Sequence, residues 1–324
     1  MARLLITGGA GYVGSHCVKT LAAAGHECVV YDNLFRGHRE FVKWGPLIEG
    51  DVRDAGRLAQ VFGANAFDAV LHFAALAYVG ESVLEPDRYH DVNETGTRTL
   101  LTAMRDAGVN RIVFSSTCAV YGEPETMPIT ESTPYNPMSP YGNTKLACER
   151  MMDDFDRSCG LKSVRLRYFN AAGADPGGEI GEWHEPETHL IPLVLDAASG
   201  KREVVEIYGA DFPTPDGTAI RDYVHVTDLA DAHHRALNYL LQGGQTVAVN
   251  LGTGRGTSVR EVIQAAEKVT GNPVPFRTVG RRDGDPPELV ADPGEAKKAL
   301  DWSASVRGIE QIIADAWRWH RARD

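Results

Sequence analysis

A glycine-rich turn near the start of the chain constrains strongly what the chain can fold into. Gly8, Gly11 and Gly14 follow the apolar run 4–6 and precede a stretch with helical spacing of apolar residues. Glycines at this spacing permit a tight turn, a close approach of the backbone to a pyrophosphate, and close packing of the helix on the strand. The turn therefore predicts a strand–turn–helix unit that binds a dinucleotide.

The first half of the chain alternates short apolar runs with helical stretches. Strands are expected at 4–6, 27–31, 69–72, 111–114 and 163–166, and helices at 13–24, 53–62, 94–107 and 141–159. Strands that alternate with helices predict an α/β fold with a Rossmann-like, doubly wound parallel sheet.

The amino-acid composition changes after residue 170. Residues 171–187 are rich in Gly, Pro and Glu, which is typical of loops. Helices are expected at 191–200, 258–270 and 307–321, and short strands at 204–208 and 248–251. We therefore predict a dinucleotide-binding domain over 1–170 and a smaller α/β lobe over most of 171–324, with a return to the first domain around 219–252.

Composition argues against several classes of protein. The 324 residues carry a net charge of −11 without a dense Lys/Arg run, so no nucleic-acid partner is expected. Apolar runs of about 18 residues are absent, so no membrane span is expected. The N-terminus lacks the pattern of a secretion signal. An odd number of scattered cysteines, without C-x-x-C, indicates thiols of a reducing, cytoplasmic environment.

Candidate cofactor contacts follow the ends of the expected strands. Asp32 lies about 20 residues past the first glycines, where a carboxylate can bind both ribose hydroxyls. It would repel a 2′-phosphate, which favours NAD over NADP, although Arg36 and Arg39 lie close by in the sequence and weaken this preference. The cofactor-binding residues that we expect here are Gly8, Gly11, Tyr12, Val13, Gly14, Asp32, Asn33, Asp51, Val52, Phe73, Ala74, Ala75, Ser115, Tyr141 and Lys145.

Tyr141 and Lys145 are the candidate catalytic pair. They stand four residues apart on an expected helix, so both side chains share one face. A free phenol has a pKa of about 10, and a neighbouring ammonium and a helix N-terminus both favour the phenolate. Such pairs also occur by chance, but the strand 111–114 runs into a hydroxyl-rich segment that offers Thr117 as a partner for proton transfer.

Taken together, these motifs resemble the extended short-chain dehydrogenase/reductase family, and within it the UDP-glucose 4-epimerases. The similarity extends from Leu4 to about His320. Its motifs are GGAGYVGSH at 8–16, HFAA at 72–75, VGES at 79–82, FSST at 114–117, SPYGNTK at 139–145, RYFNAAGA at 167–174, DGTAIRDYVHV at 216–226, NLGTG at 250–254 and RRDGD at 281–285.

The resemblance implies an isomerase that interconverts UDP-glucose and UDP-galactose with tightly bound NAD. Tyr141 would remove the proton of the sugar 4-hydroxyl while hydride passes from C4 to NAD and later returns to the opposite face. Further NAD contacts are implied for Asn93 and Tyr168. UDP-sugar contacts are implied for Thr117, Asn170, His189, Leu190, Ile207, Tyr208, Arg221, Arg282 and Asp285.

The resemblance also implies a homodimer in which helices 94–107 and 141–159 pair with their symmetry mates. An apolar stripe on the second helix fits such a face, although ordinary core packing would explain it equally well. The stripe consists of Met151, Met152, Phe155 and Cys159.

Several positions depart from the family's pattern. Ala77 stands where several relatives carry a lysine near the phosphates, and Thr117 stands where many have serine. His189 replaces an asparagine beside the uridine diphosphate. Leu289 falls where a tyrosine in some relatives narrows the sugar pocket, which predicts room for N-acetylated sugars.

Other functions stay open at this point. UDP-xylose and UDP-arabinose form an alternative substrate pair. A nucleotide-sugar dehydratase or decarboxylase of the same fold is a second possibility, but a 4,6-dehydratase would carry an acid pair where Cys118 and Ala119 stand. A non-catalytic NAD-sensing protein is a third, and such proteins typically lose the tyrosine or the lysine.

No metal site is expected from the sequence. The segment 183–189 contains two histidines and two glutamates, but their spacing does not match the helical H-E-x-x-H motif. Pro186 would also break the helix that this motif needs.

Overall fold

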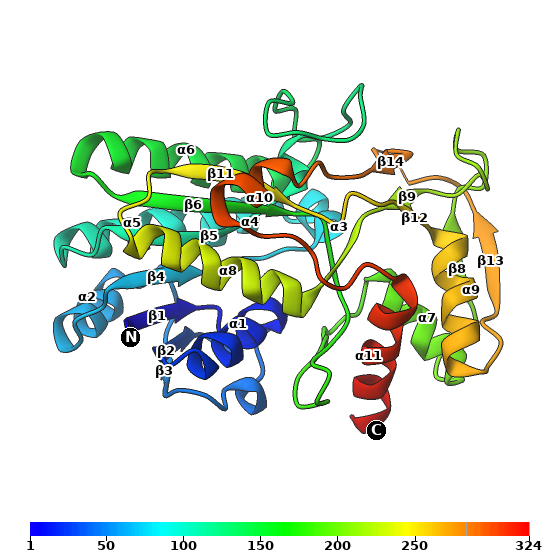
Figure 1. Ribbon diagram of the computed structural model, residues 1–324, viewed down its shortest axis with the longest axis horizontal. Coiled ribbons are helices and arrows are strands. Elements are labelled where there is room, and N and C mark those ends of the chain that lie inside the picture. Colours follow the sequence, from blue (N-terminus) through cyan, green and yellow to red (C-terminus); the bar gives the residue numbers. More distant parts are fainter. Residues whose placement is uncertain (283, 324) are drawn as a thin grey trace.

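The computed structural model describes residues 1–282 and 284–323 and is built around a seven-stranded parallel sheet (Figure 1). Its strand order is β11-β6-β5-β4-β1-β2-β3. The strands are β1 (Arg3–Thr7), β2 (Glu27–Asp32), β3 (Leu47–Glu49), β4 (Ala69–His72), β5 (Arg111–Thr117), β6 (Lys162–Tyr168) and β11 (Val247–Leu251). The predicted Rossmann-like, doubly wound sheet is confirmed.

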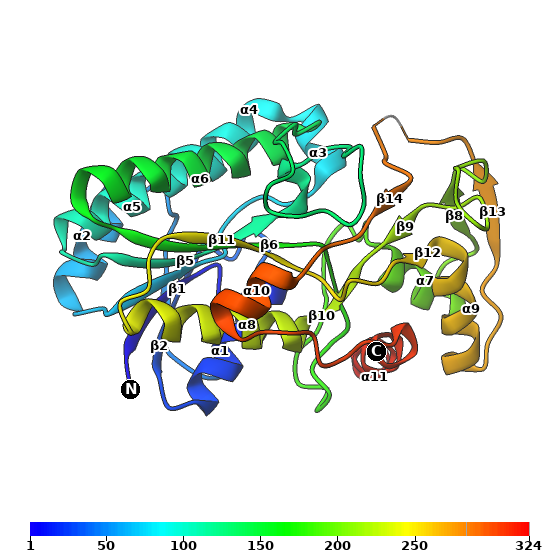
Figure 2. The same cartoon turned by 45° about the horizontal axis from the view of Figure 1, so that its top comes forward.

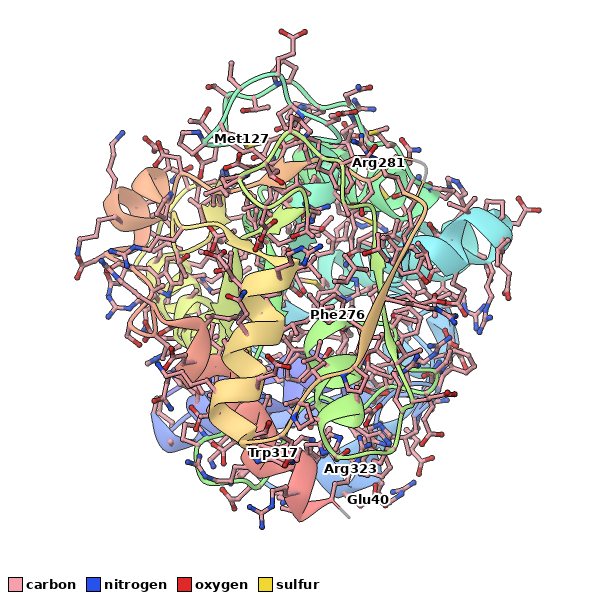
Figure 3. The ribbon with its side chains drawn as sticks, turned by 90° about the vertical axis from the view of Figure 1, so that its right-hand side faces the viewer. Glu40, Met127, Phe276, Arg281, Trp317 and Arg323 are labelled. Carbon is pink, nitrogen blue, oxygen red and sulfur yellow. The ribbon has the colours of Figure 1, made fainter. Side chains whose placement is uncertain are left out.

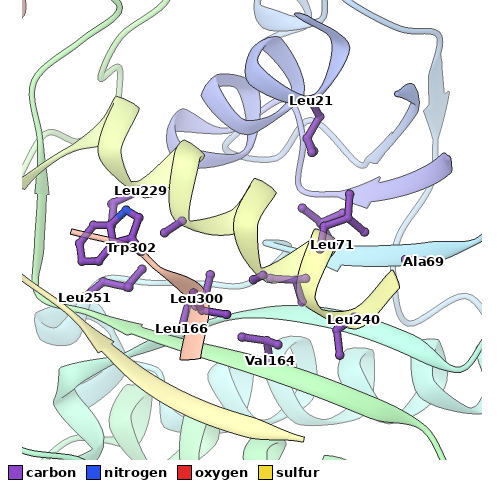
Figure 4. Packing of buried hydrophobic residues seen from close by; sticks show 14 of the residues in the cluster. Leu21, Ala69, Leu71, Val164, Leu166, Leu229, Leu240, Leu251, Leu300 and Trp302 are labelled. Atoms are coloured by element: carbon purple, nitrogen blue, oxygen red, sulfur yellow. The ribbon is translucent and has the colours of Figure 1, made fainter. Parts of the chain in front are cut away.

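Helices cover both faces of the sheet (Figure 2). One face packs against α1 (Tyr12–Ala23), α8 (Val226–Leu241) and α10 (Gly294–Leu300). The other packs against α2 (Ala55–Ala64), α5 (Gly96–Asp106) and α6 (Pro140–Cys159). Figure 4 shows the first of these two cores, where Leu229 of α8 and Trp302 lie over Leu251 of β11.

A second group of elements lies beyond one end of the sheet and has its own apolar core, seen from the side in Figure 3. Its helices are α7 (Leu190–Ala198), α9 (Val259–Thr270) and α11 (Ile309–Ala322). The strand β8 (Val205–Tyr208) pairs in parallel with β13 (Phe276–Val279). A small sheet joins β12 (Thr257–Ser258), β9 (Ile220–Arg221) and β14 (Glu288–Leu289).

Several short elements complete the fold. Between β4 and α5 run α3 (Val79–Leu84), α4 (Pro86–Tyr89) and a π-helical turn (His90–Thr95). Strand β7 (Asn170–Ala172) pairs in parallel with β10 (Tyr223–His225). The domain division near residue 170 remains a prediction.

The sequence pattern did not predict helices α8 and α10. Helix α8 begins at an unusual N-cap, because the ring of His225 accepts a hydrogen bond from the Thr227 amide at 3.2 Å. Serine, threonine, aspartate and asparagine are the usual caps. Helix α10 begins after Pro293 without a side-chain cap. In the described part of the chain, no helix is both long and apolar enough to cross a membrane.

Candidate active site

The carboxyl ends of the central strands meet at one edge of the sheet, and the candidate site lies along this edge. Thr7 at the end of β1 is in register with His72 of β4, and Thr117 at the end of β5 is in register with Tyr168 of β6. Ligands of doubly wound sheets bind at this edge, near the point where the strand order reverses. Here that point lies between β1 and β4.

The glycine-rich turn leaves no space for side chains. Gly8 has a φ of +74°, and a Cβ on it would lie 2.4 Å from the Ala74 amide nitrogen. A Cβ on Gly14 would lie 2.2 Å from the Gly8 carbonyl oxygen. Gly11 caps α1 without a side chain, so the first amides of α1 remain available to an anion. The turn fits the pyrophosphate of a dinucleotide.

Tyr12 and Val13 open helix α1 directly after this turn. The hydroxyl of Tyr12 donates a hydrogen bond to the Gly173 carbonyl at 2.6 Å, so this side chain ties the turn to the segment after β7. Val13 packs against the core beneath. The side chains of these two residues thus serve packing, and any cofactor contact would come from their backbone.

Asp32 is held firmly at the end of β2. Its carboxylate accepts hydrogen bonds from the amides of Ala10 at 3.0 Å and Leu34 at 2.9 Å. Burial raises the pKa of Asp32, and the two amides act in the opposite direction. A carboxylate fixed in this way presents its remaining lone pairs to a ligand at the sheet edge.

Asn33 and Asp51 form the neighbouring part of the edge. The side-chain amide of Asn33 donates to Asp51 at 3.0 Å, and Arg53 pairs with Asp51 at 2.7 Å. The hydrogen bonds from Arg53 hold the pKa of Asp51 well below its usual range. Val52 beside them is buried in the core under α2.

Residues 73–75 follow β4 and face the glycine turn. The amides of Phe73 and Ala74 both donate to the Thr7 carbonyl, at 2.8 and 3.1 Å. These two hydrogen bonds and the close approach of Gly8 fix the backbone of Ala74. Ala75 is the next residue along the same edge.

Asn93 has a positioning role. Its side chain accepts from the Leu76 amide at 2.8 Å and donates to the Leu76 carbonyl at 3.1 Å and to Thr144 at 3.0 Å. These bonds join the segment after β4 to α6, which carries the candidate catalytic pair. The NAD contact implied for Asn93 remains a prediction.

Tyr141 and Lys145 lie in the first two turns of α6, on one face, as expected. Ser139 caps this helix, since its hydroxyl accepts from the Gly142 amide at 3.2 Å. The Lys145 ammonium is buried and donates to the Ser115 carbonyl at 2.8 Å, and burial lowers its pKa to about 8. An ammonium has three donors, so two stay available to a ligand.

The environment of Tyr141 differs from the expectation. Burial raises the pKa of its phenol well above the usual value, and a hydrogen bond from Thr117 offsets this only in part. In the chain alone, burial therefore acts on this phenol in the direction opposite to the effect expected from the neighbouring ammonium. A nearby positive charge from a bound cofactor would act in the required direction.

Three further hydroxyls lie near this pair. Thr117 is buried at the end of β5, and its hydroxyl accepts from the Ala119 amide at 3.1 Å. The hydroxyls of Ser115 and Tyr168 share a short hydrogen bond. Lys145 bonds to the carbonyl of the same serine, so Ser115 contacts both Tyr168 and Lys145.

A buried ion pair beneath α6 was missed in the sequence. Glu149 and Arg167 expose only 2% and 1% of their side chains, and the Arg167 Nε donates to Glu149 at 2.9 Å. Ser116 donates to Glu149 at 2.5 Å, and Arg167 donates to Tyr121 at 2.8 Å. The available signal was helical spacing, because Glu149 lies four residues after Lys145 on the same face.

The candidate substrate residues lie across the edge from the catalytic pair, on the second group of elements. Arg221 of β9 forms an ion pair with Asp285, and the Arg282 guanidinium lies 3.6 Å from the centre of the Tyr208 ring. These contacts bring four of the expected residues into two neighbouring pairs. An arginine held beside an aromatic ring or a carboxylate is well oriented for phosphate.

Other candidate substrate residues are placed less directly. The side chain of Ile207 is buried in the core of the second group, so only its backbone is available to a base. The backbone amide of Asn170 donates a hydrogen bond to the backbone carbonyl of Asp222 at 2.9 Å. His189 occupies the N-cap position of α7, which Leu190 begins, but its ring makes no capping hydrogen bond and bonds to Glu182 instead.

The positions that depart from the family's pattern lie on both sides of the edge. Ala77 is exposed, so no side chain from this position reaches an anion. Leu289 is half-buried in β14, in register with Arg221, and packs on the small apolar cluster around Tyr121.

Comparisons with known proteins agree with this geometry. Residues 4–252 match the NAD dependent epimerase/dehydratase family. A UDP-glucose 4-epimerase of Rhizobium meliloti is 53% identical over 99% of this chain and 98% of its own length. The chain belongs to the NAD-dependent epimerase/dehydratase family.

Solved structures of this family have the same fold. UDP-glucose 4-epimerase from Brucella ovis, in complex with NAD, has a TM-score of 0.95 at 50% identity and covers 98% of this chain and 99% of its own. The enzyme from Stenotrophomonas maltophila, with bound NAD and formylated UDP-arabinopyranose, has a TM-score of 0.96 at 42% identity and covers 100% and 99%.

Proposed function

We propose that this protein interconverts UDP-glucose and UDP-galactose by transient oxidation at C4 of the sugar. The observation that carries the proposal is the trio of Tyr141, Lys145 and Thr117 at the carboxyl edge of a dinucleotide-binding sheet. Relatives named UDP-glucose 4-epimerase, similar over nearly their whole length, support it.

Each member of the trio has a distinct task. Tyr141 exchanges a proton with the sugar 4-hydroxyl, and Thr117 donates a hydrogen bond that keeps the reacting oxygens in line. Lys145 uses its two remaining donors on the ribose of the nucleotide and supplies a buried positive charge. When bound, NAD would accept hydride from C4 and give it back.

The remaining residues orient the substrate. Arg221 and Arg282 would hold the diphosphate, Asp285 and Tyr208 keep these guanidiniums in place, and the start of α7 borders the base. Binding through the diphosphate leaves the sugar free to turn. Both of its faces can then meet the same tyrosine, as epimerisation at one carbon requires.

A labelling experiment tests this mechanism. UDP-galactose that carries deuterium at C4 is expected to give UDP-glucose with deuterium retained at C4, because hydride leaves and returns within one site. Deuterium from labelled solvent is not expected at C4. Loss of the C4 label to water, or elimination of the C6 hydroxyl, would contradict the proposal and favour the dehydratase alternative.

Asp32 determines the cofactor preference in this account. Replacement of Asp32 with Asn is expected to weaken NAD binding by about 10- to 100-fold, since a hydrogen bond to a charged group contributes about 1.5–3 kcal/mol. The preference for NAD over NADP should fall as well. Isothermal titration of the cofactor-free protein measures both affinities.

The matched control is Asp54→Asn, at the exposed N-cap of α2, which lies outside the cofactor edge. This variant should bind NAD as the parent protein does. Equal loss of affinity in both variants would contradict the role of Asp32.

The sugar range is expected to extend beyond hexoses. Leu289 leaves more room than a tyrosine, so measurable turnover of UDP-N-acetylglucosamine is expected. Replacement of Leu289 with Tyr should lower this turnover by at least about 10-fold relative to UDP-galactose, since pocket volume discriminates on this scale. A rate equal to the blank at millimolar UDP-N-acetylglucosamine would contradict the predicted turnover of N-acetylated sugars.

A pentose pair is a second candidate substrate. The relative that holds formylated UDP-arabinopyranose is 42% identical to this chain, which makes UDP-arabinose and UDP-xylose worth assaying. The diphosphate contacts and the catalytic trio would serve either sugar, because the reacting C4 hydroxyl is common to both.

We also propose a homodimer that works in the cytoplasm. Free cysteines, among them the exposed Cys159, support a reducing compartment. The apolar stripe on α6 supports a dimer less than its sequence suggests, because Met151 and Met152 are buried in the core of one chain. Light scattering that shows a monomer at micromolar concentration would contradict the dimer.

A further inference from the structure

We propose that Glu182, His184, Glu187 and His189 form a binding site for one divalent transition-metal ion, with zinc as the best fit. The four side chains belong to the loop between β7 and α7. Each offers one ligand atom, and these four atoms all lie within 4.8 Å of one another. These residues do not form the helical H-E-x-x-H motif, and a folded loop brings them together instead.

Three of the separations between ligand atoms are close to those of a tetrahedral site, and the fourth pair, His189 and Glu182, is hydrogen-bonded and would move apart on metal binding. The Nδ1 atom of His184 lies 3.4 Å from Glu182 and 3.6 Å from Glu187. The Nδ1 atom of His189 lies 3.8 Å from Glu187 and forms a hydrogen bond to Glu182. Zinc bonds of about 2.0–2.2 Å to nitrogen and oxygen imply separations of about 3.4 Å between tetrahedral ligand atoms.

The buried Nδ1 atom of His184 gives the second observation. It has no hydrogen-bond partner, although two carboxylates face it. Glu182 and His184 expose only 6% and 15% of their side chains, so water satisfies this nitrogen poorly. A buried polar atom without a partner is costly, and a metal ion between the four groups would satisfy all of them.

A cavity of about 40 Å³ adjoins the cluster and gives an ion access. Glu182, His184 and Glu187 line it, together with Asp196 and His320, which are hydrogen-bonded to each other. A single water molecule needs about 10–15 Å³ of such space, so the cavity has room for about three.

The ligand set favours zinc or a similar ion over magnesium or calcium. Two imidazoles and two carboxylates suit transition metals, whereas magnesium and calcium prefer six or more oxygens. Four protein ligands without an open position are typical of a structural site. The ion would therefore fasten the loop that precedes α7, where Leu190 is expected to border the base.

The loop also contacts the cofactor edge, so its order matters there. The His184 ring lies edge-on to Tyr12, with ring centres 6.1 Å apart, and to Tyr78, with centres 5.6 Å apart. Tyr12 follows the glycine turn. Metal binding would thus hold the loop in contact with both the glycine turn and the segment after β4.

Metal binding can be measured without reference to activity. The full-length protein, freed of metal with a chelator, is titrated with Zn²⁺ and with Co²⁺. One equivalent of zinc should remain after gel filtration, Co²⁺ should give the strong visible absorption of a four-coordinate site, and Tm should rise by about 5 °C or more. No stoichiometric metal and no Co²⁺ absorption would overturn the proposal and leave a hydrogen-bonded His–Glu network.

Variants locate the site. His184→Asn and the milder Glu187→Gln should both abolish the Co²⁺ absorption, and circular dichroism shows whether each variant is folded. His90→Asn is the matched control, because His90 pairs with Glu94 at 2.7 Å on an exposed surface. Unchanged metal binding in a folded Glu187→Gln variant would also overturn the proposal.

Discussion

Replacement of Tyr141 with phenylalanine is expected to lower kcat by about 10³-fold, because the substitution removes the hydroxyl that exchanges a proton with the sugar. The ring packs against Leu76 and Tyr89 and would stay in place. KM for the UDP-sugar should change little, since the diphosphate contacts remain. The variant should also retain NAD. Steady-state kinetics with UDP-galactose, together with the absorbance of bound cofactor, measure these effects.

The matched control is Tyr239→Phe on α8, whose hydroxyl accepts a hydrogen bond from the Gln245 amide away from the catalytic edge. Its kcat should equal that of the parent protein. If Tyr141→Phe retains more than about a tenth of the parent kcat, Tyr141 is not the proton carrier. The test is informative because burial raises the pKa of this phenol, in the direction that opposes a phenolate.

Replacement of Glu149 with glutamine is expected to destabilise the protein by about 3–5 kcal/mol, because it leaves the Arg167 charge buried without its partner. Glu149 accepts bonds from both Arg167 and Ser116 and so couples α6 to strands β5 and β6. Urea unfolding of the cofactor-free variant measures the loss as a lower midpoint with an unchanged slope.

The control for this loss lies on the same helix. Asp154 pairs with Arg157, but both side chains are about 70% exposed. Asp154→Asn should change the free energy of unfolding by less than about 1 kcal/mol, as exposed ion pairs do. Similar losses in the two variants would show that charge on α6, and not the buried pair, determines stability.

The sequence predicts the sheet well because its strands are apolar runs between clear turn signals. The glycine turn was expected from residues close together in the chain, and it occurs as expected. Helix α8 was missed because its start is capped by a histidine. The segment that follows carries Leu229, Ala236 and Leu240 at helical spacing, which is the signal that could have found this helix, and it packs against α1 and the sheet.

The electrostatics of the site could not be predicted from spacing. The spacing of four positions from Tyr141 to Lys145 predicts a shared face, but it gives no information on burial, which dominates the pKa of both groups. The Glu149–Arg167 pair and the cluster at residues 182–189 likewise depend on how distant segments, or the turns of a loop, meet in space.

Conversion of UDP-galactose by the purified protein without added NAD, followed by proton NMR, tests the central claim most directly. The account predicts that UDP-glucose appears and approaches equilibrium with UDP-galactose, because the cofactor stays bound and is regenerated in each cycle. No conversion, even after NAD is supplied and UDP-xylose is tried, would contradict the proposed epimerase and favour a dehydratase or an NAD-sensing protein.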